Sequence, residues 1–293
     1  MSMNKDSLPN IGTMMTAEVD GLSIRYAKGG ATSGTPILLM SPWPESIYSF
    51  HSVLPELTTK NPVILIDLPG FGRSQSRPEV MAPEAMGDFI IALFRQLGIA
   101  RAHVVAPDVG TPAVLFAAAK RPELFESLVV GGAAMRADLA AGVLKDLIYS
   151  PPGALANIDG ADGVKDYLAL AAQLTPPAII EDFRAASSGR RFEEAAQFVR
   201  GYLIDSPKLE TKLSSISTPA LIMYGKSDPI VPSENGRFLA DRLPHNRHLP
   251  LDAGHRVWEE AATEYAKALV AWFDGDYRSM NSDRIVERFS SAS

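Results

Sequence analysis

A strand, a tight turn and a helix follow one another in the segment His103–Ala113, H-V-V-A-P-D-V-G-T-P-A, and this arrangement most limits how the chain can fold. The β-branched pair Val104 and Val105 predicts a buried strand, and Gly110 begins an alanine-rich helix. Asp108 lies at the tip of the turn, where G-x-S-x-G sequences raise one side chain above a sheet. Aspartate adopts the positive φ of such a turn more easily than most residues do. Asp108 is therefore either a side chain presented for chemistry or an ordinary cap of the following helix.

Short apolar runs alternate with helical patterns on both sides of this segment. The runs expected to form strands are residues 19–26, 36–40, 62–67, 128–131, 220–224 and 247–251. The stretches expected to form helices are residues 50–57, 83–97, 113–120, 234–242 and 259–274. Runs that are apolar along their whole length are typical of parallel strands buried on both faces. The alternation predicts an α/β fold with a doubly wound, mostly parallel sheet.

The alternation stops after about residue 137, where the chain becomes alanine-rich, helical and punctuated by proline and glycine. We expect this segment, residues 137–213, to be a helical cap inserted into a core made of residues 14–136 and 214–275. The flanking residues 1–13 and 276–293 are expected to be flexible or peripheral tails. Within the second tail, residues 283–289 either form one more helical turn or fray.

The composition limits which kinds of partner and binding site the protein can have. The chain has 293 residues, 46% of them hydrophobic and none of them cysteine, with a formal net charge of −6. The negative charge argues against nucleic acid and against an anionic membrane surface as partners. Disulfides and cysteine metal sites are excluded, and the histidines lack metal-ligand spacing. We expect a cytoplasmic protein, a monomer or homodimer, that uses no cofactor and acts on a small apolar organic molecule.

Three ionisable residues follow predicted strands, at the sheet edge where open α/β sheets bind ligands. They are Asp108 in the turn, Asp228 in Y-G-K-S-D-P-I-V-P and His255 in D-A-G-H-R-V-W. A carboxylate can attack an sp³ carbon that bears a strained or good leaving group, giving an alkyl–enzyme ester. A histidine oriented by an aspartate can then activate the water that hydrolyses this ester. We expect Asp108 to be the nucleophile, His255 the base and Asp228 its orienting partner, although an isolated histidine is often only structural.

Two backbone amides are expected to hold the oxyanion that such a reaction forms. One is the amide of Val109, directly after the nucleophile, and the other is that of Trp43 in the early loop M-S-P-W-P-E-S. This loop can also be read as an ordinary proline-rich turn.

Residues 36–273 resemble the α/β-hydrolase superfamily, and W-P-E-S followed by I-Y-S-F-H-S-V-L-P-E-L is similar to epoxide hydrolases. The resemblance implies a helical cap, an Asp nucleophile with an Asp–His pair, and cap tyrosines that donate a hydrogen bond to the opening epoxide oxygen. The candidates for that donor are Tyr202, in an apolar helical stretch, and Tyr167; Phe183 stands where a tyrosine is expected.

The sequence departs from the family pattern at several positions. The His-Gly of H-G-x-P is Ser41-Pro42, and the Gly-His before the nucleophile is Ala106-Pro107. Val109 stands where related enzymes carry Trp, which helps hold a halide, or Arg, which helps hold a carboxylate. An epoxide hydrolase-like enzyme is the first reading, and a haloalkane or haloacid dehalogenase is the second. A member repurposed as a lyase, cyclase, isomerase or ligand-binding protein is the third.

Overall fold

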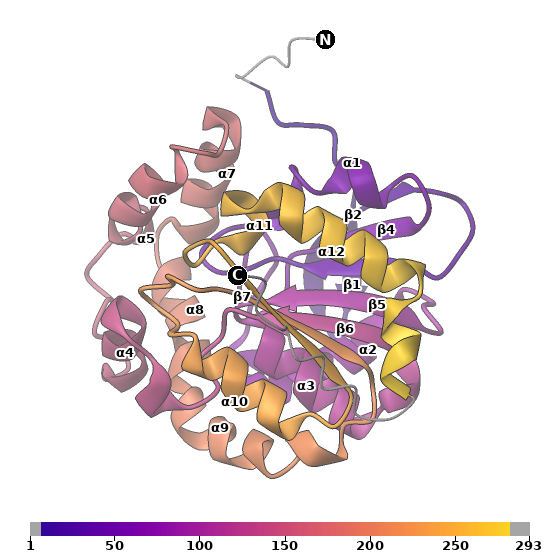
Figure 1. Cartoon of the computed structure of the whole chain (residues 1–293). Coiled ribbons are helices and arrows are strands. Elements are labelled where there is room, and N and C mark those ends of the chain that lie inside the picture. The colour runs from indigo at the N-terminus through magenta and orange to yellow at the C-terminus, as the bar shows by residue number, and fades with distance from the viewer. Residues whose placement is uncertain (1–6, 282–293) are drawn as a thin grey trace, which may run out of the picture.

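The computed structural model describes residues 7–281 and contains one eight-stranded sheet (Figure 1). The strands are β1 (Thr13–Val19), β2 (Leu22–Gly30), β3 (Ile37–Met40), β4 (Pro62–Ile66), β5 (Ala102–Pro107), β6 (Phe125–Gly131), β7 (Ala220–Gly225) and β8 (Asn246–Leu251). Their order across the sheet is β1-β2-β4-β3-β5-β6-β7-β8. Strand β2 runs antiparallel to both of its neighbours, and all the other pairs are parallel. The predicted α/β class with a mostly parallel sheet is confirmed.

Helices cover both faces of this sheet. The helices of the α/β part are α1 (Leu54–Leu57), α2 (Pro83–Gln96), α3 (Gly110–Lys120), α10 (Glu234–Arg242), α11 (Val257–Glu260) and α12 (Ala262–Asp274). The 3₁₀ helices are η1 (Ile47–Phe50), η2 (Pro78–Val80), η3 (Pro122–Leu124), η4 (Ala137–Leu139), η5 (Leu213–Ser215) and η6 (Asp276–Asn281). Successive side chains of a strand point to opposite faces, so Val104 joins the core under α2 and α3 while Val105 joins the core under α1 and α12. Both cores are continuous, which holds the central strand β5 rigidly between them.

The first apolar run folds as a hairpin, which corrects the prediction of one strand over residues 19–26. Asp20 and Gly21 have φ values of 47° and 74°, as in the two-residue turns that match the twist of paired strands. The chain therefore reverses at this dipeptide, and Val19 pairs with Leu22. Two helix predictions also need correction. Residues 50–57 contain only α1 after the end of η1, and residues 259–274 are interrupted at Ala261, between α11 and α12.

The segment proposed above as a cap contains six α-helices; α4 to α7 lie on the left side of Figure 1, and α9 lies at the bottom. They are α4 (Gly142–Tyr149), α5 (Gly160–Gly163), α6 (Lys165–Ala171), α7 (Pro177–Ser187), α8 (Arg191–Arg200) and α9 (Tyr202–Glu210). Asp182 of α7 accepts two hydrogen bonds from Arg25 of β2, at 3.1 and 3.0 Å, and one from Ser46 at 2.6 Å. Arg191 of α8 donates to the carbonyl oxygens of Gly72 and Ser74. These contacts tie the helical segment to the sheet part of the molecule.

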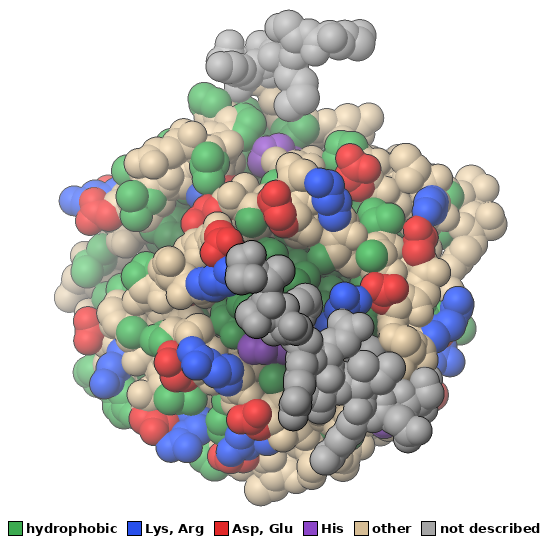
Figure 2. Space-filling model, viewed as in Figure 1, with side chains coloured by type: hydrophobic (Ala, Val, Ile, Leu, Met, Phe, Trp, Pro, Cys, Tyr) green, Lys and Arg blue, Asp and Glu red, His purple; other side chains and the backbone are tan. Residues whose placement is uncertain are grey.

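The chain beyond α12 continues as η6, where Tyr277 is buried and donates a 2.6 Å hydrogen bond to Glu126 of β6. The helical turn expected at residues 283–289 lies outside the described residues. No helix within residues 7–281 is long and apolar enough to span a bilayer. Acidic and basic side chains are interspersed over the face shown in Figure 2.

Candidate active site

The turn after β5 holds Asp108 in a left-handed conformation, with φ at 52°. Its amide donates to the Gly131 carbonyl of the neighbouring strand at 2.9 Å, and the Thr111 hydroxyl donates to the Ala106 carbonyl at 2.7 Å. Helix and strand pass so close that a Cβ on Gly110 would lie 3.1 Å from the Cβ of Ala106. Small residues are therefore required on both sides of the turn, and the backbone around Asp108 has little freedom.

The Asp108 carboxylate is turned toward the loop that follows β3. The Trp43 amide donates to Asp108 Oδ2 at 2.7 Å, and the Val109 amide also hydrogen-bonds the carboxylate. Helix α3 has no side-chain cap, so the alternative reading of Asp108 as a helix cap does not describe this side chain. The structure brings the two amides expected to form an oxyanion hole onto a single carboxylate.

His255 faces the other oxygen of Asp108, with its Nε2 4.0 Å from Oδ1. Its Nδ1 donates to Asp228 Oδ2 at 2.7 Å. The remaining oxygen of Asp228 accepts the amides of Ile230 and Val231 at 2.8 and 2.9 Å, so the loop after β7 fixes this carboxylate. Three residues far apart in the sequence thus meet at the carboxyl edge of the sheet.

The surroundings shift the pKa of both Asp108 and His255. Burial raises the pKa of Asp108 to about 6, although the charge of His255 and the two amides oppose this rise. Burial alone would lower the pKa of His255, but the hydrogen bond and charge of Asp228, with the charges of Asp108 and Glu45, raise it to about 9. Near neutral pH the site therefore holds an aspartate anion beside an imidazolium.

The two tyrosines expected near the substrate have different surroundings. Tyr202, the first residue of α9, is 1% exposed and close enough to Asp108 for that charge to raise its pKa further above the effect of burial. Within the described residues its hydroxyl has no hydrogen-bond partner. The hydroxyl of Tyr167, in contrast, donates to Glu45. Of these two described tyrosines, Tyr202 is the one whose hydroxyl has no protein partner.

Glu45 is a site residue that the sequence analysis missed. Its side chain is fully buried, and it accepts hydrogen bonds from Tyr167, from Arg256 Nε at 2.6 Å and from Trp258 Nε1 at 3.1 Å. The only signal in the sequence is an acidic residue two positions after Trp43, in a loop that is otherwise nearly apolar.

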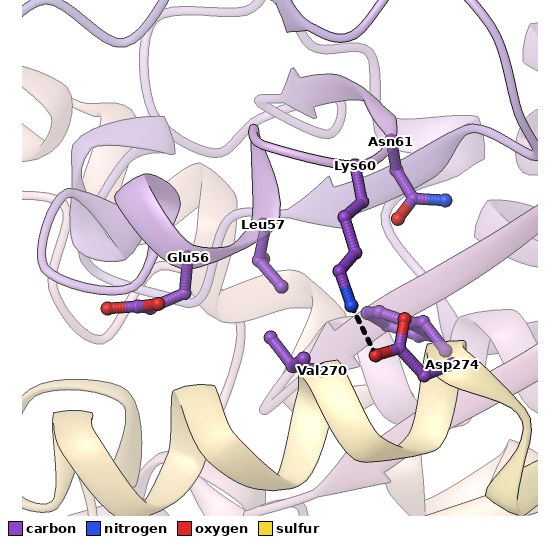
Figure 3. A pocket seen from close by; sticks show the side chains of 7 residues that line it. Glu56, Leu57, Lys60, Asn61, Val270 and Asp274 are labelled. Carbon is purple, nitrogen blue, oxygen red and sulfur yellow. Dashed lines mark hydrogen bonds and ion pairs between the residues drawn. The ribbon is translucent and has the colours of Figure 1, made fainter.

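Other possible binding features lie away from these residues. The cavity in Figure 3, between α1 and α12, has a volume of about 10 Å³, room for about one water. Its lining includes Lys60 and Asp274, which form an ion pair, and none of the residues of the aspartate–histidine site. No group of three or more His, Asp or Glu side chains in residues 7–281 could hold a metal ion.

The comparisons with known proteins identify the family of the chain. Residues 35–262 match the protein family described as alpha/beta hydrolase fold. The chain belongs to the α/β-hydrolase family. The resemblance noted in the sequence is therefore confirmed at the level of the superfamily.

Related proteins carry several different activities. The α/β-hydrolase is 28% identical to the putative carbamate hydrolase RutD of Caulobacter sp. (strain K31), over 90% of this chain and 99% of that one. It is 29% identical to a soluble epoxide hydrolase of Corynebacterium sp. (strain C12), over 39% of each chain. The structure of haloalkane dehalogenase DbeA from Bradyrhizobium elkani superposes with a TM-score of 0.76 at 20% identity, covering 90% of this chain and 98% of that one. The family identifies a hydrolase, and the named activities of these proteins differ in their substrates.

Proposed function

We propose that this α/β-hydrolase opens a small apolar epoxide to a diol through a covalent ester at Asp108. One observation carries the proposal: the carboxylate has one oxygen on the Trp43 amide, at 2.7 Å, and the other 4.0 Å from His255, with the Val109 amide also favouring its charged form. The first oxygen is thereby fixed as the future carbonyl oxygen, and the second is left to attack. A carboxylate in this position suits attack on an sp³ carbon, because the product is an ester that water can hydrolyse.

In the first step Asp108 Oδ1 attacks an epoxide carbon and the carbon–oxygen bond of the ring breaks. The Tyr202 hydroxyl gives its proton to the alkoxide that leaves, and the proton held by His255 restores Tyr202. Because Asp108 loses its charge when it is esterified, His255 also loses an attraction that favoured its protonated form. The neutral imidazole is then available as a base.

In the second step His255 takes a proton from water, and the oxygen of that water attacks the ester carbonyl carbon of Asp108. The amides of Trp43 and Val109 stabilise the oxyanion. Removal of one such donor typically lowers the rate by about a hundredfold or more. Collapse of the intermediate breaks the bond between the carbonyl carbon and the oxygen of the product, and the leaving alkoxide takes the proton of the hydroxyl that water added. The diol keeps the oxygen originally on Asp108. The 2.7 Å bond from His255 to Asp228 supports this role of histidine and disfavours the repurposed, non-hydrolytic reading.

One observation favours an organohalide as a second candidate substrate. The Trp43 indole N–H has no hydrogen-bond partner within the described residues, and its ring stacks on Phe192 of α8 with centroids 4.9 Å apart. An indole N–H can hold a departing halide, whereas that of Trp258 is occupied by Glu45. Such a reaction would use the same ester at Asp108.

A single turnover in H₂¹⁸O tests the proposal, with enzyme in excess over an aryl or alkyl epoxide. Mass spectrometry should find labelled oxygen in the peptide that contains Asp108 and unlabelled diol. The peptide that contains Asp228 is the internal control and should gain no label. Diol formed with an unlabelled Asp108 would make this residue a base and refute the covalent mechanism. Label at Asp108 with halide release, in a protein inert toward epoxides, would favour the second candidate.

A further inference from the structure

Glu45 connects three separate parts of the site. Two residues before it, Trp43 supplies the amide that holds Asp108. Its carboxylate accepts Arg256, the neighbour of His255 in sequence, and also Tyr167 of α6. One buried side chain therefore joins the loop that holds the nucleophile, the loop that carries the base, and the helical segment above them.

The loop that carries His255 has a second carboxylate support. Glu260 accepts the amides of Gly254 and Arg256, at 2.6 and 3.0 Å, so the residues on both sides of His255 are fixed. The Arg256 side chain then links Glu45 directly to the loop that carries His255. Thr175 accepts a 2.7 Å hydrogen bond from the same guanidinium, and Glu259 forms an ion pair with it.

We propose that Glu45 is a positioning residue whose buried carboxylate sets both the geometry and the charge of the Asp108–His255 pair. The proposal rests on the proposed function for its catalytic meaning. The effect of the Glu45 charge on His255 does not depend on any substrate.

The charged and titratable groups around the pair define what Glu45 adds. Asp108 interacts with His255 and Glu45, and its charge acts on the hydroxyls of Tyr202 and Tyr167. His255 interacts with Asp228, Asp108 and Glu45. Glu45 itself faces Tyr167 and Arg256, and its charge also reaches His51. Among these described interactions, Glu45 is the one negative charge outside the set Asp108, His255 and Asp228 that acts on both Asp108 and His255. Its removal should therefore lower the pKa of both groups.

The matched variants Glu45→Gln and Glu259→Gln test this role. Both remove one buried carboxylate that contacts Arg256, but the charge of Glu259 is not among the main influences on Asp108 or His255. The His255 pKa is measured in the substrate-free protein by NMR titration of labelled histidine rings, with His255→Gln used for assignment. We expect Glu45→Gln to lower it by at least about half a pH unit and Glu259→Gln to leave it unchanged. The pH midpoint of single-turnover ester formation should move to lower pH in the same variant.

A purely structural Glu45 would lower the melting temperature of Glu45→Gln without moving either midpoint, and that result would overturn the proposal. Equal shifts in both variants would overturn it as well. If Glu45→Gln does not fold, Tyr167→Phe keeps the carboxylate and removes only its link to α6. That variant should lower kcat/KM at least about fivefold with no fall in the His255 pKa; wild-type kcat/KM would contradict the proposal. Because the titration needs no substrate, it separates failure of this role from failure of the proposed epoxide chemistry.

Discussion

Acidification should slow the formation of the Asp108 ester about tenfold between about pH 8 and about pH 5. The reason is the raised pKa of this buried carboxyl, about 6 in place of the ordinary 3.8. With a pKa of about 6 only about one tenth of the carboxyl is ionised at pH 5, and nearly all of it is at pH 8. An ordinary carboxyl would stay more than about nine-tenths ionised over this range. In the proposed mechanism the attacking species is the anion, so the rate should follow its fraction.

The assay is a rapid-quench single turnover with enzyme in excess, in which the alkylated peptide containing Asp108 is quantified by mass spectrometry. The His255→Gln variant serves two purposes here, because it blocks hydrolysis of the ester and removes the positive charge 4.0 Å from Oδ1. That charge lowers the pKa of Asp108. Its loss should therefore move the midpoint of ester formation to higher pH.

A rate of ester formation that stays constant from about pH 5 to about pH 8 would refute the reasoning. So would a midpoint that moves to lower pH in His255→Gln. Folding is checked at each pH by circular dichroism, so that acid unfolding is not mistaken for protonation of the nucleophile.

Four further predictions address single residues. Tyr202→Phe should slow ring opening about a hundredfold, a typical contribution of a general acid, while hydrolysis of the preformed ester is unchanged in a quench experiment. Asp228→Asn should slow ester hydrolysis by about a thousandfold or more, so that alkylated protein accumulates in the mass spectrum; rapid turnover without accumulation would argue against its orienting role. Burial lowers the pKa of His103 to about 4 in the folded protein. As the pH falls from 6.5 toward 4, this histidine therefore binds a proton in the unfolded chain but not yet in the folded one. Stability should fall by up to about 3 kcal/mol over that range in urea unfolding, and His103→Leu should lose this dependence; parallel curves would contradict it. Asp182→Asn should weaken the contact of α7 with Arg25 and raise the rate of substrate binding in stopped-flow by about fivefold, whereas an unchanged rate would show that this contact does not limit access.

The parts of the fold that follow local rules could be predicted from the sequence. The β-branched residues before Asp108 and Gly110 after it predict the turn. Gly110 is needed because the close approach of strand and helix leaves no room for a larger side chain. The hairpin at Asp20 and Gly21 is also predictable from the sequence. This dipeptide is a strong hairpin signal, and the prediction failed because the apolar run on both sides of it was read as continuous.

The parts of the site that depend on distant contacts could not be predicted. The three donors to Glu45 come from α6, α11 and the residue just before α11, and no spacing in the sequence places them together. For the same reason the sequence left the choice between Tyr202 and Tyr167 open. A hydroxyl's availability depends on its neighbours in space, and only the structure shows that Glu45 occupies one of the two.

The double pairing of Arg25 has a consequence for how the helical segment can move. Its Nε donates to Asp67 at 2.5 Å, and its two terminal nitrogens bind Asp182 of α7. Asp67 also accepts the amides of Ile47 and Arg73, so it keeps three partners when α7 departs. The groups set free are Asp182, which would enter water on separation, and the uncharged Ser46 hydroxyl. Outward motion of α7 thus breaks this contact without stranding an unpaired charge in the interior, and repeated exchange of reactant and product is compatible with an intact fold.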